Sequence, residues 1–357
     1  MITVVGTTEE ALAAFVHRTV HGANAVEVHN LVPIAGGFSR ETFRFDAHVT
    51  TSEGRHVLPM ILRKDPPAAA SILQTSRKVE HDLIEALRVH TSLPVSRSYG
   101  YEMDASVFGE CAMVIQRMHG SGQTSNLFNG GDDADQVDDV VRHLCEMMAE
   151  LHSADVDRLN VDGQMSDPRG VGIDTSSWDA YMDSTFEYYI SSYPTFAYDP
   201  SAQIVLDAAL TLRRHKPRPL RLSLVHGDFN PANFLYEDGK VTALIDWENS
   251  RVGDPREDLG WMVAMDQMSD TSVMSHPRDE GGFLAYYNKL TGLGVTQDEL
   301  NYFVLFGTLN IAVPVSAAIQ RRVAKEHHQL LHLYMLQPAL ATLVGFTRVL
   351  GYPGVPA

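Results

Sequence analysis

The sequence has few cysteines and no long apolar run. Only Cys111 and Cys145 occur in 357 residues, both inside largely apolar stretches, which argues against a disulfide framework and a cysteine zinc site. We interpret both as small buried hydrophobic residues and expect a cytoplasmic protein. No segment approaches the roughly 18 uninterrupted apolar residues of a membrane helix. The first ten residues lack the basic and then apolar order of a secretory signal, so we expect no membrane partner.

Basic residues are also scarce. The chain has 28 Lys and Arg against 45 Asp and Glu, a formal net charge of -17. Phosphate backbones require a concentrated basic face, so we expect no nucleic-acid partner. Net charge bears on solubility and steering and does not identify a ligand. With 44% hydrophobic and 20% charged residues, the composition is that of an ordinary globular protein with one large or two modest domains.

The first third of the chain is predicted to be rich in strands. Short apolar or alternating runs predict strands near 31–34, 41–45, 57–63 and 111–115, although Pro59 disfavours the third. Apolar residues at helical spacing predict one helix over residues 76–90, with a stripe formed by Val79, Leu83, Ile84 and Leu87. A turn-rich run over 120–131 predicts a boundary.

The rest of the chain is predicted to be mainly helical. Apolar residues recur at helical spacing over 137–151, and helices are expected again over 301–349. A strand-turn-strand segment at 224–246 interrupts them. The predicted fold class is therefore α+β, with a small β-rich lobe over residues 1–118 and a large helical lobe over residues 119–357.

The most informative segment begins at His226-Gly227-Asp228 and continues through Asn233 to Asp246. Apolar residues flank a turn at 237–240, in which Gly239 can supply the positive φ of a tight hairpin. Such a hairpin would fold Asp246 back beside Asn233. It would bring a carboxylate and an amide oxygen together, close to the second carboxylate of Asp228.

This arrangement suits phosphoryl transfer from ATP. Magnesium takes oxygen ligands and needs only one or two from the protein when phosphates supply others. A further aspartate orients the acceptor hydroxyl and receives its proton. We therefore predict Asp228 as the catalytic base, with Asn233 and Asp246 as magnesium ligands. The alternative is that these are polar loop residues that cap turns.

The motifs around this segment resemble those of a known family. They are His226-Gly227-Asp228 with Asn233, Ile245-Asp246-Trp247-Glu248, Val252-Gly253-Asp254-Pro255 and Asp258-Leu259. The chain resembles the aminoglycoside phosphotransferase-like kinases, which are related to choline and homoserine kinases and to kinase domains fused to acyl-CoA dehydrogenases. The resemblance covers roughly residues 30–345. It implies a bilobal protein-kinase-like fold, with Asp246 where protein kinases carry the aspartate of Asp-Phe-Gly.

Two further residues of the motifs have predicted roles. We expect His226 to brace the catalytic loop by hydrogen bonding to backbone, with action as the catalytic base as the alternative. Asp258 is expected to buttress the loop or cap a helix, rather than take part directly in the chemistry.

The small lobe is expected to close over ATP. Gly36, Gly37 and Ser39 stand where the family has its turn over the phosphates. A cation against the phosphates, held by a helix carboxylate, is also needed. Glu80 is the candidate carboxylate, and an exposed helix acid is the alternative.

The candidate for the cation is Arg63, where the family often has lysine. Strand alternation places Arg63 and Lys64 on opposite faces, and we favour Arg63. Arginine and lysine are not interchangeable at such a site. The connector from Gln116 to Met118 is expected to present backbone groups to the adenine.

The acceptor is expected to be a small-molecule alcohol, neutral or partly apolar. Residues 301–357 contain one acid, Glu326, against four basic residues, and are rich in aromatic and aliphatic residues that are core by default. The acidic run over 132–139 is interpreted as a solvated helix start. The alternatives are an aminoglycoside or macrolide antibiotic, a hydroxyacyl-CoA, whose phosphates Arg321, Arg322 and Lys325 would meet, or a catalytically silent kinase-like protein.

Overall fold

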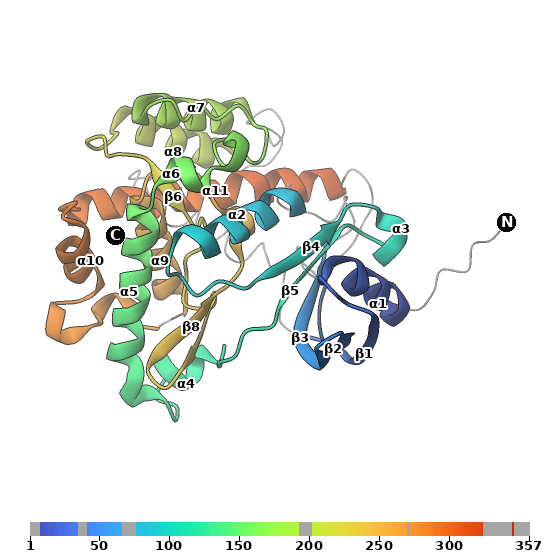
Figure 1. The fold of residues 1–357 in the computed structure, drawn as a ribbon. Coiled ribbons are helices and arrows are strands. Elements are labelled where there is room, and N and C mark those ends of the chain that lie inside the picture. The colour runs from blue at the N-terminus through green and yellow to red at the C-terminus, as the bar shows by residue number, and fades with distance from the viewer. Residues whose placement is uncertain are drawn as a thin grey trace.

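The structure is a computed structural model that describes residues 8–34, 41–65, 76–192, 202–269, 271–323 and 345. It has two lobes, a small one built on an antiparallel sheet and a larger helical one (Figure 1). The strands of the small lobe are β1 (Ala25–Pro33), β2 (Glu41–Thr51), β3 (Gly54–Lys64), β4 (Ser98–Glu102) and β5 (Ala112–Gln116), in the order β1-β2-β3-β5-β4. The predicted α+β bilobal fold is confirmed.

One face of this sheet carries the core of the small lobe. Phe45, Ala47 and Val49 alternate along β2 as buried residues, which is the period of a half-buried strand. They pack against Phe15 of helix α1 (Thr8–Thr19). Neither α1 nor β4 was predicted. The five residues of β4 include Gly100, whose φ is +133°, beside an irregularity in its pairing with β5, so they show no regular alternation.

Helix α2 (Arg77–His90) forms where the sequence predicts it. The Ser76 side chain caps it by accepting a hydrogen bond from the Val79 N–H. Its apolar stripe, Leu83, Ile84 and Leu87, belongs to the core of the large lobe and not to the core beneath the sheet. Helix α2, which lies between β3 and β4 in the chain, is therefore anchored in the core of the large lobe.

The large lobe contains most of the helices. They are α4 (Thr124–Phe128), α5 (Val137–Ser153), α6 (Val156–Leu159), α7 (Trp178–Ser191), α8 (Ala202–Arg214), α9 (Arg256–Ser269), α10 (Phe283–Thr291) and α11 (Gln297–Val323). The short α3 (Ala105–Phe108) lies in the small lobe. Short 3-10 turns lie at Ala134–Gln136, Val161–Gly163, Trp247–Asn249, Val273–Ser275 and Arg278–Glu280.

Two small antiparallel ribbons carry the catalytic segment. Strand β6 (Ser223–Val225) pairs with β9 (Arg251–Gly253), and β7 (Phe234–Glu237) pairs with β8 (Lys240–Leu244). A bridge between Val95 and Leu244 ties this region to the segment before β4. The predicted lobe boundary at residue 118 follows the end of β5 by two residues, and it stays a prediction.

Helices α9 and α11 approach closely. A Cβ atom on Gly260 of α9 would clash with the backbone of Phe303 in α11, so this position requires glycine. Tyr302, Phe303 and Phe306 are buried in a core shared with α7 and α8. The expectation that these aromatic residues are core is confirmed. Of the helical region predicted over 301–349, the part after Val323 lies outside the described residues, except residue 345.

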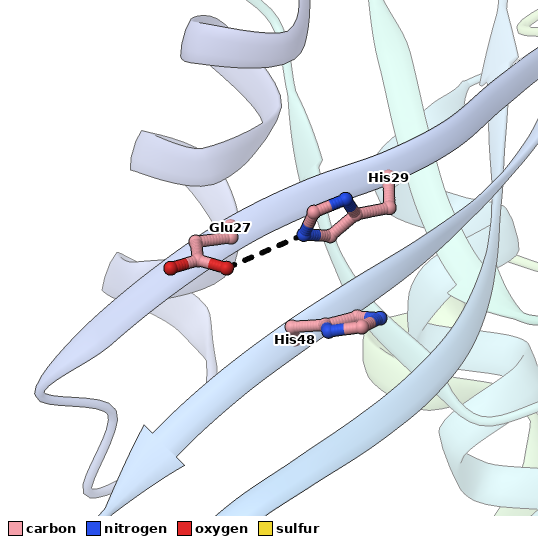
Figure 2. A group of neighbouring side chains, drawn as sticks. All are labelled: Glu27, His29 and His48. Carbon is pink, nitrogen blue, oxygen red and sulfur yellow. Dashed lines mark hydrogen bonds and ion pairs between the residues drawn. The ribbon is translucent and has the colours of Figure 1, made fainter.

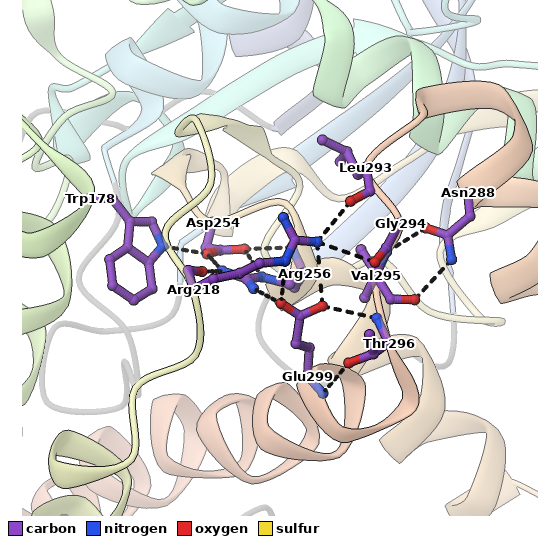
Figure 3. Close-up of polar contacts among 10 residues, drawn as sticks. All are labelled: Trp178, Arg218, Asp254, Arg256, Asn288, Leu293, Gly294, Val295, Thr296 and Glu299. Atoms are coloured by element: carbon purple, nitrogen blue, oxygen red, sulfur yellow. Dashed lines mark hydrogen bonds and ion pairs between the residues drawn. The ribbon is translucent and has the colours of Figure 1, made fainter.

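A buried polar network fixes the segment after β9 to the surrounding helices (Figure 3). The Arg256 guanidinium is fully buried and donates to both carboxylate oxygens of Asp254, at 2.9 and 2.6 Å, and to Glu299 Oε1 at 2.9 Å. Trp178 of α7 donates its indole N–H to Asp254 at 2.6 Å. Arg256 therefore ties the start of α9 to α7 and to α11. Across the described ranges, no helix is long and apolar enough to cross a bilayer.

Candidate active site

A tight hairpin places two of the predicted site residues side by side. Asp238 and Gly239 both have positive φ, 49° and 74°, at the turn between β7 and β8, as in the hairpin turns that match strand twist. The Ile245 N–H donates to the Asn233 carbonyl at 3.0 Å, so Asp246 follows directly beside Asn233. The predicted hairpin and its glycine turn are confirmed.

Asp246 itself has an unusual backbone. Its φ is +69° and ψ is +60°, a left-handed conformation that is strained for a residue with a Cβ atom. Such strain costs of order 1–3 kcal/mol and is typical of functional sites. This conformation changes the direction of the chain just after β8, where the Asp246 carboxylate contacts Arg63.

The Asp228 carboxylate is held by three side-chain donors. Asn230 and Trp261 each donate to Oδ1 at 2.7 Å, and Asn233 donates to Oδ2 at 2.8 Å. Burial, and next the nearby charge of Asp246, raises the pKa of Asp228 to about 7, although the three hydrogen bonds act in the opposite direction. A general base works best when its pKa lies near the working pH. Asp228 has that property in this structure.

The oxygen atoms at this point fit a magnesium ion. The Asn233 side-chain nitrogen donates to the carboxylate and to the backbone oxygen of Asp228, at 2.8 and 3.0 Å. Its amide oxygen is therefore the atom left for a cation. Together with the Asp246 carboxylate it offers hard oxygen ligands, which magnesium prefers.

His226 has both ring nitrogens directed at backbone groups. Nε2 lies 3.1 Å from the Ile245 carbonyl oxygen, and Nδ1 accepts from the Asp228 N–H at 3.3 Å. Burial lowers the pKa of His226, which favours the neutral ring that this pattern needs. The contacts match the predicted bracing role. They leave no nitrogen directed at a substrate proton.

Asp258 supports the same loop from α9. Its two oxygens accept the N–H groups of His226 and Gly227 at 2.7 and 2.9 Å, and Oδ2 also lies 3.1 Å from His152 Nε2. Burial by itself would raise the pKa of Asp258, but these partners outweigh it and lower the pKa. Gly227 has a φ of +77°, and a Cβ atom there would clash with the Asn249 carbonyl oxygen, so the loop requires glycine.

Arg63 reaches from the small lobe into this centre. It donates to Glu80 at 2.7 Å and to Asp246 at 2.5 Å, and its side chain is 11% exposed. Lys64 instead pairs with Glu41, a largely exposed carboxylate, at 3.0 Å. Arg63 is therefore the residue of the two that contacts the helix carboxylate. Its role toward phosphate stays a prediction.

Several residues of the centre escaped the sequence prediction. Arg77 is fully buried, pairs with Glu80, and lies 3.1 Å from Asp65; its place three residues before Glu80 on one helix was the available signal. Trp261 and Asn230 also escaped it. Trp261 follows Asp258 by three residues on α9, so both side chains face the same loop. Asp258 was predicted from the sequence and Trp261 was not.

Part of the predicted nucleotide site cannot be placed. Gly36, Gly37 and Ser39 lie outside the described residues. At the connector, the Gln116 N–H donates to the Arg97 carbonyl at 2.8 Å and the Arg117 N–H to the Pro59 carbonyl at 3.0 Å. Within the described chain the Met118 N–H makes no backbone hydrogen bond, which leaves it available to an adenine.

A separate cluster of potential metal ligands lies on the exposed sheet. Glu27 and His29 of β1 and His48 of β2 have their ligand atoms within 4.8 Å of one another (Figure 2). Imidazole nitrogens suit zinc or copper better than magnesium. The Arg55 guanidinium already donates to Glu27 at 2.8 Å and lies 2.9 Å from His48 Nδ1. The cluster is thus balanced by arginine and lies apart from the catalytic loop.

The fold and the site define a kinase-like class, with a sheet lobe that carries the buried Arg63 and a helical lobe that carries the Asp228 carboxylate. A family model described as a phosphotransferase enzyme family matches residues 30–299. The chain belongs to this family, the aminoglycoside phosphotransferase-like enzymes predicted from the motifs.

Individual relatives are distant. Acyl-CoA dehydrogenase family member 11 of Mus musculus is 26% identical over 280 residues, which are 73% of this chain and 33% of that protein. The chain spans about a quarter to a third of the length of the curated relatives that match it first. A Ralstonia eutropha protein assigned as an aminoglycoside phosphotransferase has a TM-score of 0.65 at 20% identity, over 94% of this chain and 95% of that one. A thermostable mutant of APH(4)-Ia with ADP and hygromycin B has 0.56 at 17% identity, over 89% and 94%.

Proposed function

We propose that this protein transfers the terminal phosphoryl group of ATP, with magnesium, to a hydroxyl of a small and partly apolar molecule. The observation that carries the proposal is the Asp228 carboxylate, held by three donors next to Asn233 and Asp246. This set supplies a base and two metal ligands, the parts that phosphoryl transfer asks of a protein.

The residues of the catalytic loop have distinct parts in this proposal. Asp228 orients the acceptor hydroxyl and takes its proton as the oxygen bonds to phosphorus. Asn233 and Asp246 hold magnesium, which when bound neutralises charge on the phosphate oxygens. His226 and Asp258 keep the loop in place through its backbone.

The nucleotide side is proposed to rest on Arg63. Its contact with Asp246 occupies the carboxylate that would ligate the metal, so we infer that Arg63 turns toward the phosphates when nucleotide binds, while Glu80 keeps hold of it. Gly36, Gly37 and Ser39 are proposed to cover the phosphates, and the connector at Gln116 and Met118 to meet the adenine. The APH(4)-Ia structures with ADP and with AMP-PNP support the use of ATP.

The first test measures thermal stabilisation by ATP with magnesium, and ATP turnover. Asp246→Ala should lose both, because it removes a metal ligand. Asp228→Asn should keep the stabilisation and lose about 10²- to 10⁴-fold in turnover, the usual contribution of a general base. The control is Asp132→Asn, a change of the same kind at an exposed loop residue. Full turnover by Asp228→Asn would contradict the base assignment, and stabilisation unaffected by Asp246→Ala would contradict the metal assignment.

The acceptor class needs a transfer screen. Aminoglycosides, macrolides, hydroxyacyl-CoAs and simple alcohols should be offered with labelled ATP, and we expect an acceptor with an apolar body to be phosphorylated. Hygromycin B in the APH(4)-Ia structure and gentamicin in that of APH(2")-IIa are the reason to include aminoglycosides. Binding of magnesium and ATP without transfer to any acceptor would favour the silent kinase-like alternative.

A further inference from the structure

A cleft bordered by two arginines lies beside the loop that carries Asp228. Its walls come from the loop over 166–173, from α7 and α11, and from Arg251 of β9. Three tyrosines of α7 line it, Tyr181, Tyr188 and Tyr189, and Asn310 of α11 closes one side. The lining combines these tyrosines and the aliphatic Val171 and Ile173 with polar groups, among which two arginines could orient a ligand.

Two chains of contacts connect this cleft to Asp228. Arg251 Nη1 donates to the Asn249 carbonyl at 3.0 Å and lies 2.6 Å from the place of a Cβ atom on Gly227, the residue before Asp228. On the other side, Trp261, which donates to Asp228, packs against Gly307 of α11. Asn310 follows Gly307 by three residues, and so lies on the same face of that helix. The cleft therefore lies close to the loop that carries the predicted base.

Most charges in the cleft are balanced within the protein. Glu257 pairs with Arg251 and also accepts hydrogen bonds from Tyr181, at 2.5 Å, and from the Asp254 N–H, at 2.9 Å. Asp167 accepts the backbone N–H groups of residues 171, 172 and 173 at 3.1, 2.7 and 3.3 Å. The carboxylates of Glu257 and Asp167 thus have hydrogen-bond partners other than Arg169.

Arg169 is the exception. Its guanidinium donates to Asn249 Oδ1 at the long distance of 3.4 Å, and within the described residues no carboxylate lies within ion-pair distance of it. Burial, and next the charge of Arg251, lowers its pKa, while Tyr189, Tyr188 and Tyr181 act in the opposite direction. Arg169 is half-buried, and a charge that is partly withdrawn from water is costly unless it is paired. Among the described residues no carboxylate pairs with this arginine, which is consistent with a partner that comes from the ligand.

We propose that Arg169 binds an oxyanion of the phosphate acceptor, which is a hydroxy compound with an apolar body and one carboxylate or phosphate group. This inference rests on the proposed function and narrows its substrate class. The planar guanidinium can hold either oxyanion with two parallel hydrogen bonds. The tyrosines would cover the apolar body, and the hydroxyl would reach Asp228. Polycationic acceptors are disfavoured by the same charge.

The test compares acceptors in matched pairs. Hydroxycarboxylic acids are paired with their neutral amides, and phosphate-bearing alcohols with the same alcohols without phosphate. We expect the wild type to prefer one class of anion over its neutral partner by at least about 10-fold in kcat/KM. In Arg169→Gln the preference should fall by about 10- to 100-fold through KM, the range expected for a lost charge-assisted hydrogen bond. Arg169→Lys should retain part of it, because the charge remains.

The control is Arg158→Gln, the same change at an exposed residue of α6, which should keep the preference. A second readout needs no turnover: the preferred anionic acceptor should raise the melting temperature of the wild type and not that of Arg169→Gln. Equal use of charged and neutral acceptors, or equal stabilisation of both proteins, overturns the inference while phosphoryl transfer stands. If the wild type did not bind ATP with magnesium, the proposed function itself would be wrong. The two failures are therefore distinct.

Discussion

The nucleotide side and the acceptor side of the proposed site hold their arginines in opposite ways. On the nucleotide side, the buried Arg63 contacts two carboxylates, those of Glu80 and Asp246. On the acceptor side, the half-buried Arg169 contacts an amide oxygen and, among the described residues, no carboxylate. The first charge is satisfied before any ligand arrives, and the second is not. An arginine balanced by the protein contributes to the fold, whereas one that lacks a counter-ion indicates where a ligand belongs.

Arg256 gives the largest expected effect and sets the scale for a balanced arginine. Arg256→Met should lower the free energy of unfolding by about 3–5 kcal/mol, because Asp254 and Glu299 would remain buried without their main partner. Urea unfolding measures this loss. A loss below about 1 kcal/mol would show that this network does not hold the helices together.

Arg63 should show a smaller loss of stability and a large loss of function. Arg63→Met should cost about 1.5–3 kcal/mol of unfolding free energy, less than Arg256→Met, because Arg77 remains on Glu80. Stabilisation by ATP with magnesium should also fall. Arg63→Lys keeps the charge but removes the planar guanidinium group, so it tests whether a lysine at this position supports nucleotide binding. Stabilisation by ATP with magnesium equal to that of the wild type in Arg63→Met would remove Arg63 from the nucleotide site.

Mild acid leaves the arginines charged, so a change of stability with pH reports on other groups. One such group is His226, in the loop that carries Asp228. The folded state lowers the pKa of His226 below the usual value near 6.5, so the unfolded state binds more protons once the pH drops below that value. The contribution of His226 to stability should be complete above pH 6.5 and fall below it, by at most about 1.4 kcal/mol per pH unit. The raised pKa of Asp228 acts in the opposite direction and is present in both proteins, so the test is the difference between them: from pH 7.5 to 5.5 the unfolding free energy of the wild type should decrease relative to that of His226→Gln.

Replacement of Arg169 should have the smallest effect on the unfolding free energy. This result decides whether Arg169 differs from the balanced arginines Arg63 and Arg256. Arg169→Met should change the unfolding free energy by less than about 0.5 kcal/mol or increase it, because it removes a half-buried charge that no described carboxylate balances. A loss close to that of Arg256→Met would show that Arg169 is a structural residue and that the two sides of the cleft are alike.

Local patterns made much of the site predictable. The hairpin that joins Asn233 to Asp246 depends on two adjacent strands and a glycine turn, all within 14 residues. Strand alternation was enough to place Arg63 on the face opposite Lys64. The α+β class followed from periodicity, and the bilobal kinase-like fold followed from the family resemblance that the motifs between residues 226 and 259 carry.

Other parts depend on contacts that periodicity does not encode. Trp261 meets Asp228 from a helix that lies 33 residues further along the chain. Arg169 stands in a loop without regular spacing, and the tyrosines of α7 and Arg251 of β9 that share its cleft come from distant parts of the chain. Strand β4 is short and irregular, so alternation could not reveal it.

The placement of α2 has a consequence for how such an enzyme can be controlled. Leu83, Ile84 and Leu87 of this helix are at most 2% exposed, inside the core of the large lobe. An outward movement of the helix that separated Glu80 from Arg63 would expose these three side chains to water. The free-energy cost would be about 1.5–3 kcal/mol for each side chain. An on-off switch that works by displacing this helix would have to overcome that penalty. We therefore expect the contact between Glu80 and Arg63 to be present with and without ligand.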